Sequence, residues 1–138
     1  MKKCQSIPVF YQCPICGNFV EIIEASGMIP VCCGQEMQKV VAKFNDEALE
    51  KHVPVCTVKC GKVVVKVGST PHPMLEEHHI CWIELVTDKG IQRKCVYPKE
   101  EATACFHIGD NENVIAVYEF CSQHGLWSSV DTTKLEPS

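Results

Sequence analysis

Asn113-Val114-Ile115-Ala116-Val117-Tyr118-Glu119-Phe120 is the stretch that decides the fold, because β-branched and aromatic residues fill a run of strand length. Two earlier runs, residues 63–67 and 80–86, have the same character, and turn residues such as Asp88-Lys89-Gly90 separate them. Only residues 46–50 look like a helical turn. The sequence therefore predicts an all-β fold, with an antiparallel β sandwich or barrel in its larger part.

The first forty residues differ from the rest in composition. They are punctuated by Cys, Gly and Pro, and residues 18–23 form their one strand-like run. So short a segment has too little apolar core to fold without a staple, which a metal ion would supply. We expect two domains, residues 1–40 and residues 41–138.

Composition excludes several classes of protein. The chain has 138 residues, of which 46% are hydrophobic, and 13 Lys and Arg against 17 Asp and Glu give a net charge of −4. No basic cluster is longer than Arg93-Lys94, so nucleic acid is not expected as a partner. No apolar run approaches the roughly 18 residues that span a bilayer, and no secretory signal stands at the start. We expect no membrane partner and a cytoplasmic location.

Cysteine is unusually frequent, with 11 residues, an odd number. An even number and a secreted chain would favour disulfides, so metal ligation is the better interpretation. Cys13-Pro14-Ile15-Cys16-Gly17 and Cys32-Cys33-Gly34 supply two pairs of thiols. Four such sulfurs form a tetrahedral site that suits zinc or a single iron, distorted because two ligands are adjacent. A zinc ion that only folds the segment remains the alternative.

Histidine is scarce, but the 6 histidines occur in suggestive contexts. His52 follows the expected helical turn, and His72 lies between two prolines and precedes His78-His79. Cys121 and His124 place a thiolate and an imidazole on one turn, a ligand set that suits iron, copper or zinc. Taken singly, each histidine is more often a surface or hydrogen-bonded residue than a ligand. Their recurrence at strand ends favours a second metal site.

Together, the two blocks C-x-x-C…C-C-G and E-K-H-x-P…H-P-M-x-x-x-H…C-x-x-H-G-L-W resemble desulfoferrodoxin, the two-iron form of superoxide reductase, over essentially the whole chain. The resemblance implies a desulforedoxin-like domain with an Fe(Cys)4 centre, followed by an immunoglobulin-like β sandwich with an Fe(His)4(Cys) centre. Zinc could replace iron in the first centre. The ligands so implied are Cys13, Cys16, Cys32 and Cys33 for the first iron, and His52, His72, His78, His124 and axial Cys121 for the second.

His79 departs from the family, which usually has an aromatic residue beside the third histidine. Neighbouring strand residues point to opposite faces, so only one of His78 and His79 can ligate, and the six-residue step from His72 favours His78. The resemblance also implies catalytic roles for Glu50 and Lys51. Without it, a solvated charged pair at a helix end would be the preferred interpretation of these two residues.

The resemblance implies the one-electron reduction of superoxide to hydrogen peroxide, with electrons from a rubredoxin-like donor, in a homodimer. Phe10, Val20 and Ile22 are candidate contact residues between the two copies. Five protein ligands would leave one position of the metal open, which is typical of a catalytic site. A non-catalytic iron electron carrier and a zinc-stapled binding module are the alternatives from other classes, and a dismutase is the alternative enzyme.

Overall fold

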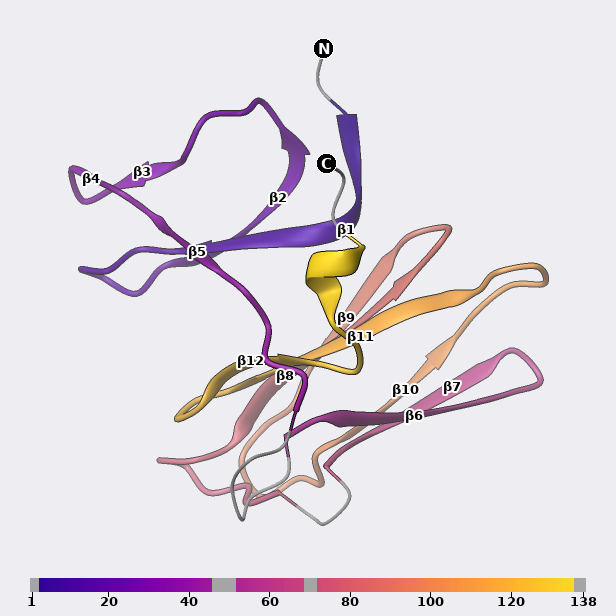
Figure 1. Ribbon diagram of the computed structural model, residues 1–138. Helices are drawn as coiled ribbons and strands as arrows, with labels where there is room; N and C mark the ends of the chain where they lie inside the picture. The colour runs from indigo at the N-terminus through magenta and orange to yellow at the C-terminus, as the bar shows by residue number, and fades with distance from the viewer. Residues whose placement is uncertain (1–2, 46–51, 69–71, 136–138) are drawn as a thin grey trace. The chain divides into compact units, whose positions relative to one another are not determined.

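The computed structural model describes residues 3–45, 52–68 and 72–135 of the chain (Figure 1). These residues divide into two compact units, Met1–Val41 with Leu135–Ser138, and Ala42–Lys134. The expected helical turn at residues 46–50 lies outside the described residues. The C-terminal end from Leu135 groups with the first unit, whereas the sequence indicated a tail belonging to the larger domain.

The first unit is built from short antiparallel strands. A three-stranded sheet has the order β2-β1-β5, and a hairpin pairs β3 with β4. The bounds are β1 Lys3–Gln12, β2 Phe19–Ala25, β3 Val31–Cys32, β4 Gln35–Glu36 and β5 Gln38–Val40. Its few buried apolar side chains include Ile7, Phe10 and Met37, so this unit has only a small core. Both turns that carry the cysteine pairs belong to it.

The second unit contains two antiparallel sheets. One has the order β10-β7-β6 and the other β12-β11-β8-β9. The bounds are β6 Pro54–Lys59, β7 Lys62–Val67, β8 Ile80–Thr87, β9 Ile91–Cys95, β10 Thr103–His107, β11 Val114–Cys121 and β12 Gly125–Ser128, followed by a 3-10 turn at Thr132–Lys134. The prediction of an all-β fold with an antiparallel sandwich is confirmed.

The core of the second unit lies between its two sheets. Strand β7 alternates, so that Val63, Val65 and Val67 are buried while Lys62 and Lys66 are exposed. Ile83 and Leu85 of β8, Phe106 of β10 and Val117 of β11 belong to the same apolar cluster. Cys121, the last residue of β11, is also part of the cluster. Packing of the hydrophobic core therefore holds the Cys121 side chain in place.

Helix is nearly absent from the described part of the chain. Within it, no helix is long and apolar enough to cross a membrane.

Candidate metal centres

The turn between β1 and β2 carries the first two sulfurs. The backbone N–H groups of Ile15 and Cys16 each donate to the Cys13 sulfur at 3.4 Å, which fixes this sulfur inside the turn. Gly17 follows with φ 82°, a conformation that glycine adopts without a steric penalty. The turn therefore presents Cys13 and Cys16 side by side.

The β3–β4 hairpin supplies the other two sulfurs. Cys16 Sγ lies 3.6 Å from Cys32 Sγ, which in turn lies 3.9 Å from Cys33 Sγ. A tetrahedron with metal–sulfur bonds of about 2.3 Å has sulfur–sulfur edges of about 3.8 Å. All four sulfurs lie within 4.8 Å of one another, so the donor set fits a tetrahedral zinc or iron ion.

The cysteines of this cluster differ in acidity. Hydrogen bonds from the backbone N–H groups of Cys16 and Ile15 lower the pKa of Cys13 to about 6. The Cys16 and Cys13 sulfurs raise the pKa of Cys33 to about 12, and Cys16 also raises the pKa of Cys32. Cys13 thus offers a thiolate at neutral pH, and a bound metal would supply the positive charge that Cys32 and Cys33 require to ionise.

The second cluster is assembled from three separated segments of the second unit. His52 precedes β6, His72 follows β7, and His78 lies just before β8. Cys121 ends β11, and His124 lies in the turn to β12. His52, His72, His78 and Cys121 each offer a ligand atom within 4.8 Å of the others. The sandwich therefore gathers residues that are far apart in the sequence.

The four imidazole rings form a closed square. Ring centroids are 4.7 Å apart for His52–His72, 5.0 Å for His72–His78, 5.0 Å for His78–His124 and 4.9 Å for His124–His52. Each pair meets edge to face. His124 Nδ1 lies 3.2 Å from His52 Nε2, close to the about 3.0 Å that separates two nitrogens bound at right angles with bonds of about 2.1 Å.

The Cys121 sulfur lies close to two opposite rings of this square. It is 3.6 Å from His72 Nε2 and 3.8 Å from His124 Nδ1. Four imidazoles and one thiolate would together hold an iron ion. Five protein ligands would leave one of six coordination positions for a small ligand.

Hydrogen bonds orient the rings at two positions. His72 Nδ1 lies 2.7 Å from the Pro73 carbonyl, so this nitrogen carries the proton and Nε2 is left to bind a metal. The ring of His79 turns away from the square, with Nδ1 3.0 Å from the Leu75 carbonyl. The structure thus brings His78, and not His79, to the other three rings.

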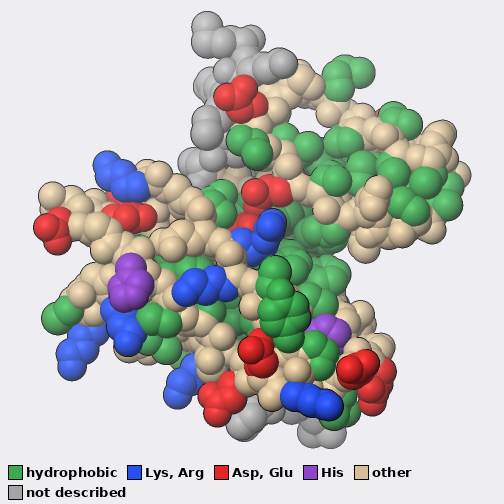
Figure 2. Space-filling model, turned by 180° about the vertical axis from the view of Figure 1, so that it is seen from behind, with side chains coloured by type: hydrophobic (Ala, Val, Ile, Leu, Met, Phe, Trp, Pro, Cys, Tyr) green, Lys and Arg blue, Asp and Glu red, His purple; other side chains and the backbone are tan. Residues whose placement is uncertain are grey.

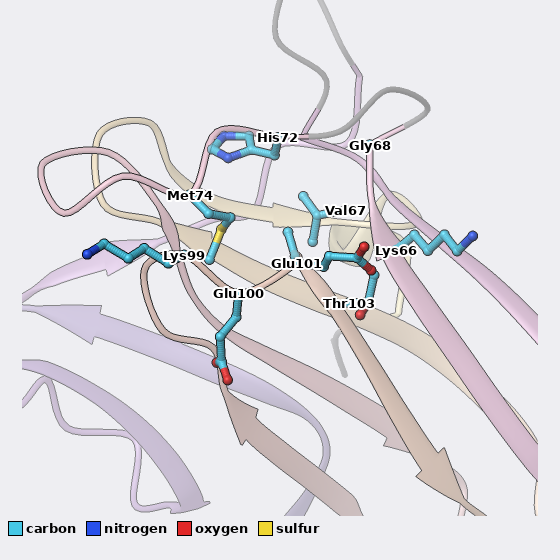
Figure 3. A pocket seen from close by; sticks show the side chains of 10 residues that line it. Lys66, Val67, Gly68, His72, Met74, Lys99, Glu100, Glu101 and Thr103 are labelled. Atoms are coloured by element: carbon cyan, nitrogen blue, oxygen red, sulfur yellow. The ribbon is translucent and has the colours of Figure 1, made fainter.

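The square is shielded on one side and accessible on another. Cys121 and His52 are buried, His78 is half-buried and His124 is exposed. A cavity of about 530 Å³ adjoins the His72 ring, with Val67 and Met74 in its wall (Figure 3). The lining also includes Glu100 and Glu101, while the ammonium groups of Lys66 and Lys99 point outward to opposite sides (Figure 3). Those two carboxylates disfavour an anion in this cavity.

Two of the other cysteines have protected thiols. Burial raises the pKa of Cys56, and burial together with the Glu119 charge raises the pKa of Cys81. Because the thiolate is the reactive form, these two thiols resist oxidation at neutral pH. No disulfide joins the cysteines that the structure describes.

Comparison with known families agrees with this division of the chain. Residues 8–40 match the model of the desulfoferrodoxin N-terminal domain, and residues 44–130 match that of desulfoferrodoxin. The chain belongs to the desulfoferrodoxin family. The desulfoferrodoxin homolog of Archaeoglobus fulgidus is 44% identical over 119 residues, which is 86% of this chain and 94% of that protein. Desulfoferrodoxin of Syntrophotalea carbinolica is 41% identical, over 86% and 93% of the two chains.

A solved structure is similar to this desulfoferrodoxin along most of the chain. The superoxide reductase from Treponema pallidum matches with a TM-score of 0.76 and 34% identity. The match covers 89% of this chain and 98% of that chain.

Two side chains contact the second cluster without being among its candidate ligands. The Trp127 indole, at the end of the C-x-x-H-G-L-W block, stacks on the His52 ring with 4.6 Å between centroids. Lys43, which no motif marked, lies with its ammonium over the Trp127 ring. Glu50 and Lys51, the expected catalytic pair, lie outside the described residues.

Proposed function

We propose that this protein is an iron-dependent superoxide reductase, which converts superoxide to hydrogen peroxide at its second metal centre. The observation that carries the proposal is the square of four imidazoles with one sulfur beside it. A structural metal has a closed ligand shell, whereas these five protein ligands would leave one of six coordination positions for a substrate. Family membership supports the same activity, since the structural relative from Treponema pallidum is a superoxide reductase.

The reaction joins one superoxide, one electron and two protons to give one hydrogen peroxide. Iron bound by the four histidines and Cys121 would supply the electron from its ferrous state. The four imidazoles and Cys121 would hold the metal, and the buried Cys121 packs in the hydrophobic core. His124 is exposed, so a small anion from solvent would reach the site from the side of this residue.

We propose that Lys51 attracts the anion and orients water for protonation, and that Glu50 covers the open position after turnover. The positions of Glu50 and Lys51 in the sequence support these roles, because the two residues directly precede the candidate ligand His52. A lysine ammonium beside an open metal face raises the local concentration of a small anion. Lys51→Met should slow the reaction with superoxide and weaken its dependence on ionic strength, while Lys51→Arg should retain that dependence.

The test begins with metal analysis and an ultraviolet–visible spectrum of protein purified without oxygen. Oxidation with ferricyanide should add a thiolate-to-iron absorption band to the spectrum of the Fe(Cys)4 centre. A superoxide pulse on the reduced protein should then give one hydrogen peroxide per second-site iron oxidised. An iron at the second site that ignores superoxide would leave an electron carrier, and zinc at both sites would leave a structural module.

We further propose that two copies associate through the first unit. Apolar side chains gather on the face of this unit visible in Figure 2, and Met28, Ile23 and Val31 are 82%, 70% and 65% exposed. So large an exposed apolar patch favours an interface between proteins. Phe10, an expected contact, is 4% exposed and packs against Phe19 inside the unit, whereas Ile22 lines a cavity beside Met28.

Light scattering tests this association. Wild-type protein should have the mass of a dimer, and Met28→Lys should shift it toward the monomer without changing the metal content. An unchanged dimer would contradict the proposed surface.

Finally, we propose a rubredoxin-like donor and a cytoplasmic location. The donor must be a one-electron carrier, since each turnover consumes one electron. The odd number of cysteines and their metal-ligand spacing favour metal ligation over disulfides, which supports a reducing compartment. Oxidation of reduced rubredoxin in step with superoxide consumption, absent without this protein, is the expected result.

A further inference from the structure

Lys43 is fixed beside the second metal centre by its backbone. It forms a parallel bridge with Trp127 at the edge of β12. The Lys43 N–H donates to the Leu126 carbonyl at 3.0 Å, and the Ser128 N–H donates to the Lys43 carbonyl at 2.8 Å. These hydrogen bonds involve only backbone atoms of Lys43. The side chain can therefore be replaced while the segment stays paired with β12.

The Lys43 ammonium makes two contacts next to the ligand square. It donates to the His124 carbonyl at 3.3 Å and lies 5.1 Å from the centroid of the Trp127 ring. An ammonium at this distance from an indole is attracted by the negative face of the ring. The Trp127 Nε1–H donates to the same His124 carbonyl at 3.2 Å. The Lys43 ammonium and the Trp127 Nε1–H therefore donate to the same acceptor, the carbonyl of the candidate ligand His124.

Trp127 connects the ammonium to a second ligand. Its ring stacks on His52 with an interplanar angle of 11°, and His52 is 1% exposed while Trp127 is 7% exposed. The stacked pair therefore lies in a region of low dielectric, where a nearby charge acts more strongly than in water. The Lys43 ammonium thus contacts the His124 carbonyl directly, and it lies over the indole that stacks on the His52 ring.

We propose that Lys43 is a positioning residue of the second metal centre, which orients His52 and His124 and whose charge favours the reduced state of the bound iron. The inference rests on the proposed function. The step concerned is the uptake of one electron from the one-electron donor, which converts the ferric ion to the ferrous ion. The oxidised centre carries one more positive charge than the reduced one, so a fixed cation nearby disfavours oxidation.

The experiment compares the midpoint potential of the second iron in wild type, Lys43→Met and Lys43→Arg. Redox titration follows the thiolate-to-iron absorption of the second centre after the spectrum of the Fe(Cys)4 centre, which also has thiolate-to-iron bands, is subtracted. Methionine keeps an unbranched apolar stem but removes the charge and the donor, whereas arginine keeps both. Lys62→Met is the matched control, because Lys62 is an exposed lysine at the start of β7, a strand that carries none of the ligands.

We expect Lys43→Met to lower the ratio of reduced to oxidised iron at a fixed potential by about threefold to tenfold. The difference should shrink at high ionic strength because Lys43 is exposed and salt screens its charge. Lys43→Arg should restore the wild-type ratio, and Lys62→Met should leave it unchanged.

The failures of this inference and of the proposed function are distinguishable. Wild-type protein that binds no iron at the second site, or whose iron ignores superoxide, overturns the proposed function. A wild type that reduces superoxide, together with a Lys43→Met variant of unchanged potential and band position, overturns the role of Lys43 alone. An equal shift in Lys62→Met would also overturn it, because any surface charge would then have the same effect.

Discussion

His78 and His79 are neighbours in the sequence with different surroundings. The His78 ring lies 5.0 Å from both His72 and His124, whereas the His79 Nδ1 faces the Leu75 carbonyl. The His79 backbone also pairs with Ser122 through two hydrogen bonds. Pairing at His79 thus joins the start of β8 to the turn that carries His124.

We predict that His78→Ala loses iron from the second site while His79→Ala retains it. Removal of a ligand should weaken metal binding by more than the about 10- to 100-fold that follows loss of a ligand's hydrogen-bonding partner. Iron content after dialysis against a graded chelator measures the difference. Loss of iron in His79→Ala, with retention in His78→Ala, would reverse the assignment.

Cys121 is the only cysteine that clusters with the imidazoles within the described part of the chain. We predict that Cys121→Ser abolishes the absorption band of the oxidised second iron and leaves that of the first centre intact. Cys105→Ser is the control, because Cys105 lies on β10 outside both clusters. Persistence of the band in Cys121→Ser would show that another residue supplies the sulfur.

Local spacing marks some of the proposed ligands, as in Cys13-x-x-Cys16 and Cys121-x-x-His124, and the resemblance to the family implied the full set. The interactions that hold these residues in place could not be predicted from the sequence. Lys43 and His124 are 81 positions apart, and their contact depends on how an edge segment pairs with β12. Lysine is most often a solvated surface residue, so no sequence pattern separates Lys43 from the others.

At the scale of elements, β10 and β9 close the sandwich on one side. Phe106 of β10 is fully buried, and the Lys94 ammonium of β9 lies 5.2 Å from its ring centroid and donates to the Cys105 carbonyl. Gln92 donates to the His107 carbonyl at 2.8 Å. Side chains of edge strand β9 thus satisfy backbone carbonyls of edge strand β10, which protects the β10 edge from pairing with another chain.

We predict that Phe106→Ala lowers the free energy of unfolding of the second unit by about 3–5 kcal/mol, because it removes a buried aromatic ring. Urea denaturation followed by tryptophan emission measures it, since Trp82 and Trp127 both lie in this unit. Ile91→Ala, at a position 41% exposed, should cost far less. An equal loss in the two variants would mean that Phe106 is not part of the cooperative core.

A carboxylate clamp joins the β8–β9 turn to the segment before β11. Glu112 accepts from Thr87 Oγ at 2.5 Å and from the Gly109 N–H at 2.8 Å, and these bonds lower its pKa below 4.5. A pKa lowered by folding contributes stability that is present above 4.5 and lost as the pH falls through the lowered value.

We predict that Glu112→Gln is less stable than wild type at pH 7 and that the difference narrows below pH 4.5. Chemical denaturation of both proteins across this range gives the difference at each pH. Glu76→Gln changes an exposed glutamate of the same unit and serves as control. A difference that stays constant with pH would exclude the clamp as its cause.

At the scale of the whole molecule, each metal cluster draws all its described ligands from one unit. The four cysteines lie within Met1–Val41, and the histidines and Cys121 lie within Ala42–Lys134. The sequence predicts a domain boundary at residue 40, where the strand-rich pattern begins. The C-terminal end, which groups with the first unit from Leu135, carries no periodic pattern that could have revealed its partner.

We predict that Cys13→Ser loses the first metal but still reduces superoxide at the wild-type rate in a pulse experiment. Cys13 is 2% exposed and accepts two backbone hydrogen bonds, so its loss should also destabilise the first unit. Stopped-flow decay of superoxide and thermal unfolding measure the two effects. A slowed pulse reaction would show that the second centre depends on the first.

The boundary between Val41 and Ala42 separates the two sets of ligands without carrying a member of either. The two sets of ligands are therefore separable in the sequence. A Gly-Ser insert at this boundary would lengthen the segment that connects the two units. Longer inserts would weaken any electron tunnelling between the centres step by step while each centre kept its own chemistry. Turnover with an external donor would then be measured as a function of insert length. A rate that falls with length would mean that electrons pass between the two centres, and a constant rate would mean that the centres act independently.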